Sequence, residues 1–271
     1  MKKTFLKVFF SLFALSLFFS SCLGDNENTY EATNDFVYIT QSDNGLKYAV
    51  LSAYPGIFGS LTGISDASVG SCYLLSYKIN TSQVTQDGLY ILENPSISTA
   101  LQQSTSIDFY NAPPAPLGDS EVHPNSFTVA RFFPYNLMGD RWLITLNLAR
   151  DEGERIIPYV YFDTENQFED AEKQKPVGTN QIILDVLFAK QNPTGAAGVT
   201  SDYQVVLNLS PIRTNQNNTT LFPDFEFSEN LATVQVRFRY RKYKDATGAY
   251  DTTLYPSAWS SSPYMSLSNA E

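Results

Sequence analysis

The sequence contains very little histidine and cysteine, which removes several classes of catalytic and metal site. Among its 271 residues the single histidine is His123, and the two cysteines are Cys22 and Cys72. A structural zinc site needs four such ligands, so no metal site and no cofactor are expected. A nucleophilic triad would have to use His123, which lies in the stretch EVHPNS and is predicted to be a solvated loop residue.

Basic residues are also scarce, because 18 Lys and Arg stand against 28 Asp and Glu, a formal charge of −10. Three of the lysines lie in the first 21 residues, so the chain without that segment carries 15 basic and 28 acidic residues, a charge of −13. A surface this acidic repels phosphate backbones and anionic headgroups. Nucleic acid is therefore not an expected partner, and attachment to a membrane requires something other than a basic patch.

The N-terminus is apolar but too short to span a membrane. Its apolar stretch, residues 8–19, has 12 residues, whereas a spanning helix needs ~20. The stretch follows three lysines and ends at Ser20-Ser21-Cys22, the layout of a secretory signal. A signal that ends in two small residues and a cysteine resembles a bacterial lipobox, which implies removal of residues 1–21 and acylation of Cys22. The alternative is ordinary secretion with cleavage near Ser21, which leaves Cys22 as a thiol.

The residues after Cys22 are polar and acidic. The stretch CLGDNENTYEATND has no apolar period, which predicts a flexible tether over residues 22–35. It resembles the acidic signal that sends lipoproteins of the Bacteroidetes to the outer face of the outer membrane. Two or more acyl chains on one cysteine suffice for stable anchoring. We therefore expect a lipid-anchored protein of the outer membrane that faces the cell exterior.

From residue 36 onward the sequence predicts an all-β fold. Apolar side chains recur at every second position in short runs such as FVYITQ, LKYAVL and SCYLLSYKIN. Asn44-Gly45, between the first two runs, is a strong hairpin signal because both residues tolerate positive φ. Four or five strands of this length in residues 36–105 suit a small barrel or a short sandwich.

A cluster of prolines divides the chain. Pro113, Pro114, Pro116 and Pro124 lie within residues 106–126, and proline removes the hydrogen-bond donors of a central strand. This segment is predicted to be a linker or an ordered crossover. At least six strands follow in residues 127–271, which is typical of an antiparallel β-sandwich. The stretch TENQFEDAEKQK, residues 164–175, is the one candidate helix.

This layout resembles the NigD-like lipoproteins of Bacteroides and its relatives over nearly the whole chain. The resemblance rests on the lipobox followed by acids, on the tyrosine-rich stretches DNGLKYAVLSAYPG and VGSCYLLSYKIN, and on NQIILDVLFAK, SDYQVVLNLSPI and VQVRFRYRKY in the second half. It implies an OB-like barrel followed by a β-sandwich. No catalytic motif comes with the family, so Cys22 is the one site residue that the resemblance supplies.

Three arginines alternate with apolar residues near the C-terminus. On a strand, Arg237, Arg239 and Arg241 share one face, ~7 Å apart, with Val236, Phe238 and Tyr240 opposite. We expect this arginine ladder to face solvent, where it could bind the carboxylate or sulfate groups of an acidic glycan. The alternative is that the arginines pair with acids on neighbouring strands.

Two further sites follow from the C-terminal sequence YDTTLYPSAWSSSPYMS. Trp259, with Tyr255 and Tyr264 nearby, is a candidate aromatic platform for a ligand, and packing of this loop onto the sandwich is the alternative. Asp251-Thr252-Thr253 resembles the short motif at which Bacteroidetes attach O-glycans, which predicts O-glycosylation of Thr252. The alternative is an ordinary strand or turn threonine.

No established catalytic motif is present in the sequence. It has no glycine-rich phosphate loop, nucleophile elbow or metal-ligand spacing. The sequence therefore predicts a non-enzymatic, surface-exposed lipoprotein that acts as a binding or accessory module for a glycan or an envelope protein. Two alternatives stay open: a pilus-related or other structural envelope subunit that accepts a donor strand, and a glycan hydrolase with a carboxylate pair.

Overall fold

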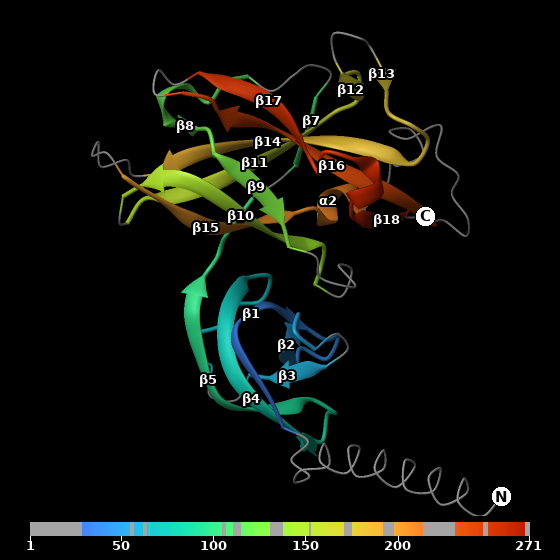
Figure 1. Cartoon of the computed structure of the whole chain (residues 1–271). Coiled ribbons are helices and arrows are strands. Elements are labelled where there is room, and N and C mark those ends of the chain that lie inside the picture. The colour runs from blue at the N-terminus through green and yellow to red at the C-terminus, as the bar shows by residue number, and fades with distance from the viewer. Residues whose placement is uncertain are drawn as a thin grey trace, which may run out of the picture.

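The computed structural model describes residues 29–54, 57–61, 64, 66–104, 107–110, 115–130, 138–151, 153–170, 175–191, 198–213, 231–245 and 249–268. It contains a closed five-stranded barrel, a four-stranded sheet, a seven-stranded sheet and a two-stranded sheet, which confirms the all-β prediction. The barrel lies beyond one face of the sheets, and β5 leads from the barrel towards them (Figure 1). Within the described residues no helix is long and apolar enough to cross a membrane.

The N-terminal unit is the barrel, closed in the order β1-β2-β3-β5-β4. Its strands are β1 (Thr29–Gln41), β2 (Lys47–Leu51), β3 (Phe58–Ser60), β4 (Cys72–Val84) and β5 (Tyr90–Ala100). Alternate side chains fill the interior, so that Val37, Ile39, Leu75 and Ile79 are at most 1% exposed. The predicted hairpin joins β1 to β2, and Gly45 there has a φ of 83°. The barrel implied by the family resemblance is therefore present.

Strand β1 begins seven residues earlier than predicted, so residues 29–35 belong to the barrel and not to the tether. They pair with β4, and a bulge interrupts this pairing between Ala32 and Asp35. The buried Asp35 carboxylate secures the bulge by accepting hydrogen bonds from the hydroxyls of Ser52 (2.5 Å) and Tyr77 (2.5 Å). Burial raises the pKa of Asp35 by more than these hydrogen bonds lower it.

The C-terminal unit is a sandwich of two sheets. The first sheet has the order β6-β15-β10-β9, with β6 (Gln102–Gln103), β15 (Val199–Asn208), β10 (Arg141–Arg150) and β9 (Ser126–Val129). The second has the order β17-β16-β14-β11-β7, with β17 (Tyr250–Tyr255), β16 (Leu231–Tyr243), β14 (Gln181–Gln191), β11 (Arg155–Asp163) and β7 (Ile107–Tyr110). In addition β18 (Tyr264–Ser268) pairs with β16, and β8 (Glu121–Val122) pairs with β14.

The sandwich is mixed, which corrects the prediction of a purely antiparallel one. The pairs β6–β15, β7–β11 and β14–β16 are parallel. Between β14 and β16 the chain crosses to β15 in the other sheet and returns, and these two reversals make β16 parallel to β14. A local sequence pattern cannot reveal this, because it depends on which distant strands meet.

The core of the sandwich lies between the inner faces of the two sheets. On β10, Trp142, Ile144 and Leu146 are fully buried, as their alternation predicts. Phe127 of β9 lies among the aromatic rings of the opposite sheet, 5.5 Å from Phe238 between ring centres. Such aromatic contacts add to the free energy gained by burying apolar area.

The described parts of the proline-rich segment, residues 107–110 and 115–126, contribute strands to the sandwich. Within residues 106–126, β7 and β8 both join the second sheet, with the 3-10 turn η1 (Gly118–Ser120) just before β8. Strand β6 already pairs with β15, so the C-terminal unit begins at residue 102 rather than at residue 127. The linker prediction missed these strands because each has only two to four residues.

The helix predicted over residues 164–175 is absent from the described part of that segment. Instead, β12 (Phe168–Asp170) pairs with β13 (Lys175–Pro176). The buried Asp163 carboxylate accepts hydrogen bonds from the backbone N–H groups of Glu165 and Asn166 (both 3.1 Å). This local turn competes with a helix start. The helical elements described are the short α2 (Ser210–Arg213), η1 and the 3-10 turn η2 (Trp259–Ser261).

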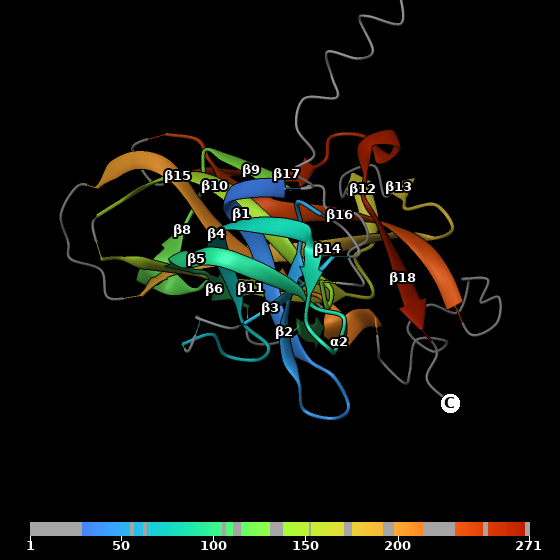
Figure 2. The same ribbon diagram turned by 90° about the horizontal axis from the view of Figure 1, so that it is seen from below.

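A third hydrophobic cluster joins the barrel to the sandwich. It consists of side chains from both units: Phe36, Val50 and Cys72 of the barrel, and Leu101, Met138, Leu143 and Val206 of the segments beyond it. The barrel therefore packs on the outer face of the β10–β15 sheet, in front of which it lies when the molecule is viewed from below (Figure 2). Burial of these apolar side chains stabilises the contact between the two units.

Candidate functional site

Strand β16 places the three predicted arginines on one face of the second sheet. Val234, Val236, Phe238 and Tyr240 belong to the sandwich core, in the register that the alternation predicts. The arginines lie on the opposite face, but this face is not the solvated surface that was expected. Arg237 is only 5% exposed, and the side chains of Arg239 and Arg241 are 14% and 16% exposed.

Arg237 is covered by the turn that follows β17. Its Nε donates a hydrogen bond to the Pro256 carbonyl (2.8 Å), and its Nη2 donates one to the Ser257 carbonyl (2.9 Å). The guanidinium also lies 5.0 Å from the centre of the Trp259 ring. Burial lowers the pKa of Arg237, and the charge of Glu169 opposes this only in part. Arg237 thus holds this turn against the sheet.

Arg239 forms a bidentate ion pair with Asp185 of the neighbouring strand β14, and Arg241 forms an ion pair with Glu121 of β8. Arg239 Nε and Nη2 donate to the two Asp185 oxygens at 2.6 and 2.7 Å. Arg241 Nη1 donates to both Glu121 oxygens at 2.7 and 2.8 Å. Burial lowers the pKa of Arg239, but the hydrogen bonds and charge of Asp185 raise it by more. Binding of an acidic glycan would have to break these contacts, so pairing within the protein describes the ladder better.

The candidate aromatic residues do not form one platform. Tyr255 packs edge-on against Phe127, 5.5 Å between ring centres, at the sandwich core. Trp259 lies with Arg237 on the other side of the sheet, and its Nε1 donates to Glu169 at 2.6 Å. Tyr264 is 53% exposed. Packing onto the sandwich therefore accounts for Tyr255 and Trp259, and Tyr264 alone presents its ring to solvent.

His123 is not the solvated loop residue that was expected. Its Nε2 lies 3.3 Å from Glu121 Oε1, and its ring centre lies 4.5 Å from that of Tyr250. Both neighbours also contact Arg241. His123 thus belongs to the charged network on the outer face of the second sheet. The predicted lipidation site, Cys22, lies outside the described residues.

Thr252 is exposed on β17, directly opposite Arg241 in the register, which meets the steric requirement for O-glycosylation. We expect glycopeptide mapping of the protein from its own host to find a glycan mass on Thr252. Thr252→Ala should abolish this mass, whereas Thr253→Ala, at a half-buried neighbour, should retain it. Recovery of the wild-type peptide without modification would contradict the prediction.

A cavity of about 530 Å³ lies where the barrel meets the first sheet of the sandwich. The barrel contributes Leu74 of β4 and Thr99 and Ala100 of β5, and the sheet contributes residues of β10 and β15. Strand β6 pairs with β15 only at Val205 and Val206, so within the described residues the preceding part of β15 has no neighbour on that side. Ligand sites prefer such junctions and typically measure ~300–1,000 Å³.

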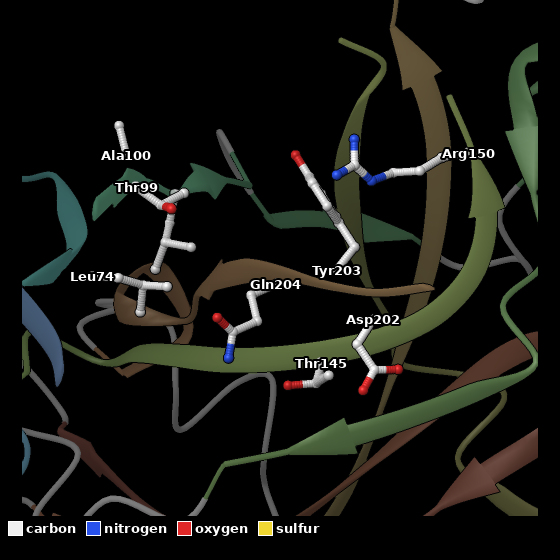
Figure 3. A pocket seen from close by; sticks show the side chains of 9 residues that line it. Leu74, Thr99, Ala100, Thr145, Arg150, Asp202, Tyr203 and Gln204 are labelled. Carbon is white, nitrogen blue, oxygen red and sulfur yellow. The ribbon is translucent and has the colours of Figure 1, made fainter. Parts of the chain in front are cut away.

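Polar side chains line the sheet side of this cavity. Side chains alternate along β15, so Asp202 and Gln204 lie on one face with Thr145 of β10, and Tyr203 projects from the other face (Figure 3). The guanidinium of Arg150 lies 4.5 Å from the centre of the Tyr203 ring. The edge of β15 thus presents groups of different chemistry to one space.

Sequence reasoning missed these residues. The stretch DYQVV predicts a strand with Asp202 and Gln204 on its solvent face, which is an ordinary composition for such a face. Only the approach of the barrel, more than 100 residues earlier in the chain, turns this face into the wall of a cavity.

The described part of the chain lacks two kinds of catalytic arrangement. Asp202 is the one carboxylate among the residues that line the cavity, whereas glycoside hydrolysis uses two. Among all the described residues, no group of three or more His, Cys, Asp or Glu is placed to hold a metal ion. Cys72 is buried at the junction of the two units, and burial raises the pKa of its thiol.

Fold and cavity together define a two-unit β protein with a candidate ligand site at the junction of its units. No family model and no curated protein sequence matches the chain. A crystal structure of an uncharacterised protein from Parabacteroides merdae aligns with 88% of this chain and 99% of its own, with a TM-score of 0.56 and 12% identity. At this identity the likeness shows the fold alone.

Two other solved structures are similar at lower scores. A putative toxin-related protein from Parabacteroides distasonis covers 86% of this chain and 96% of its own, at 12% identity and a TM-score of 0.45. A NigD-like immunity protein from Bacteroides caccae covers 83% of this chain and 92% of its own, at 11% identity and a TM-score of 0.44. A NigD-like protein, of the family that the sequence resembles, is thus among the similar structures.

Proposed function

We propose that this protein is a lipid-anchored accessory protein of the outer-membrane surface that binds a glycan or an envelope protein at the junction cavity. The observation that carries the proposal is the cavity itself, whose polar and aromatic lining comes from two units that pack against each other. Binding sites are concave and present a few convergent polar groups. The arginine ladder and Trp259, in contrast, are already engaged within the protein.

The anchoring part of the proposal rests on the N-terminal sequence. Six residues separate Cys22 from the first residue of β1, and a chain of this length extends no further than ~25 Å. An acylated Cys22 would therefore hold the barrel close to the membrane. The sandwich begins at the other end of the barrel (Figure 1), so the cavity would lie on the side away from the lipid.

The two alternatives receive less support. A hydrolase would need a second carboxylate in the cavity, where Asp202 is the one described. A donor-strand subunit would need an open groove between its sheets, whereas the core side chains of both sheets are buried in the described residues.

Photo-crosslinking in the native host tests the proposed site. With p-benzoylphenylalanine in place of Asp202, we expect an adduct with a surface glycan or an envelope protein, because the ligand would lie within reach of the cavity wall. The same group in place of Asp87, in the exposed turn between β4 and β5, should give none. Equal labelling at both positions, or no adduct at Asp202, would refute binding at this cavity.

A further inference from the structure

The chemistry of the junction cavity indicates the class of its ligand. We infer that it binds an uncharged saccharide at the edge of β15, with Gln204 and Thr145 as hydrogen-bonding groups on one face of the strand and a fixed Tyr203 on the other. This inference rests on the proposed function and specifies which of its two ligand classes occupies the site. It also replaces the acidic glycan that the arginine ladder was expected to bind.

Hydrogen-bonding capacity is available on three side chains. Within the described part of the chain, the Gln204 amide, the Thr145 hydroxyl and the Tyr203 hydroxyl have no hydrogen-bond partner. Gln204 and Thr145 share one face of the β15 edge and Tyr203 lies on the other, so a ligand at this edge meets both donors and acceptors, which suits hydroxyl groups that donate and accept. Leu74, on the barrel side, supplies an apolar surface for the C–H groups of a sugar ring.

Tyr203 is held in place before any ligand arrives. The Arg150 guanidinium lies against its ring, and Arg150 Nη1 donates to the carbonyls of Asp151 (3.3 Å) and Glu154 (3.2 Å). These contacts fix the guanidinium and, through it, the aromatic ring. A wall that is already ordered loses less conformational entropy on binding, which favours affinity.

The charges at the cavity favour a neutral ligand. The lining carries one acid, Asp202, and one base, Arg150. The carboxylate of Asp202 is exposed and accepts a hydrogen bond from the Asn147 side chain at 2.8 Å, whereas the guanidinium faces Tyr203 and two carbonyls. A uronate or sulfate would be repelled by the Asp202 carboxylate, and the Arg150 guanidinium is less available to attract it. The formal charge of the protein, −10, adds to this repulsion.

A saccharide fits the cavity better than a peptide strand. The free edge of β15 could accept a strand, since unpaired edges expose N–H and C=O groups. A peptide added there would bind through its main chain, and its affinity would not depend on the Gln204 amide. The polar side chains of Gln204, Thr145 and Tyr203, which have no hydrogen-bond partner in the described part of the chain, therefore favour a sugar over a peptide strand.

Direct binding to defined oligosaccharides tests the inference. Purified full-length protein in detergent would be titrated by calorimetry with neutral hexasaccharides of glucan, mannan and xylan, and with oligogalacturonate and a chondroitin sulfate hexasaccharide. We expect binding to at least one neutral sugar and none to the two acidic ones. Gln204→Ala should weaken that binding about 10-fold and Thr145→Val several-fold, because each removes side-chain hydrogen bonds to the ligand.

Matched variants separate the site from general effects. Gln83→Ala and Thr233→Val change the same residue types at exposed positions of β4 and β16 and should leave the affinity unchanged. Asp202→Lys, at an exposed position, should allow one of the acidic sugars to bind, because it reverses the charge at the cavity. A protein that binds none of the neutral sugars, or prefers the acidic ones, overturns the inference. A protein adduct at Asp202 in cells would then still uphold the proposed function.

Discussion

Arg239→Ala is expected to lower the free energy of unfolding of the sandwich by roughly 3–5 kcal/mol. The substitution leaves the Asp185 carboxylate, which is 6% exposed, without its bidentate partner. Removing one member of a buried ion pair costs this much because the remaining charge stays desolvated. Urea titration followed by tryptophan fluorescence measures the change, since both tryptophans of the sequence, Trp142 and Trp259, lie in the sandwich.

An exposed ion pair of the same sheet is the control. Lys244 and Asp251 lie 3.2 Å apart, with 55% and 61% of their side chains exposed, so Lys244→Ala should change stability by less than ~1 kcal/mol. In the double variant Arg239→Met/Asp185→Leu, apolar packing should recover most of the loss. If Arg239→Ala changes stability as little as Lys244→Ala does, the arginine ladder is solvated and the paired description is wrong.

Cys22→Ala is expected to release nearly all of the protein from the membrane fraction. The apolar stretch before Cys22 is too short to span a bilayer, and no described helix can do so. Attachment would then depend on the acyl chains alone, each buried methylene contributing about 0.8 kcal/mol. Detergent phase partitioning with intact mass spectrometry measures both the location and the modified N-terminus.

Cys72→Ala is the matched control, because it removes the other thiol. Cys72 is 1% exposed at the junction of barrel and sandwich, so this variant should stay in the membrane fraction. Wild-type protein that partitions into the aqueous phase, or whose mature chain begins at another residue, would favour the alternative of ordinary secretion.

The local features of the fold could be predicted from the sequence. The alternation in VQVRFRYRKY gave the register of β16, with Phe238 and Tyr240 in the core. Asn44-Gly45 gave the first hairpin, and the pattern of DRWLITLNLAR placed Trp142 in the core. These predictions succeed because the period of a strand and the conformational freedom of glycine are properties of neighbouring residues.

Predictions that needed a partner strand were less accurate. The sequence predicts a tether over residues 29–35, but in the structure these residues pair with β4. The acidic stretch near Phe168 resembles a helix in the sequence. In the structure Asp163 forms a turn before it, and β12 pairs with β13. In both cases hydrogen bonds to other segments override a weak local preference.

By itself the sequence determined the all-β class and which side chains of the long strands face the core, and it predicts a lipoprotein-like N-terminus. The tertiary structure decided which faces of those strands meet solvent. Asp185, Glu121 and the turn at Pro256 cover the arginine ladder, and the barrel covers one face of β15 to create the cavity. Alternation fixes only the side on which a residue lies. What covers that side is set by segments up to 120 residues away, whose approach follows from burial of apolar surface throughout the molecule.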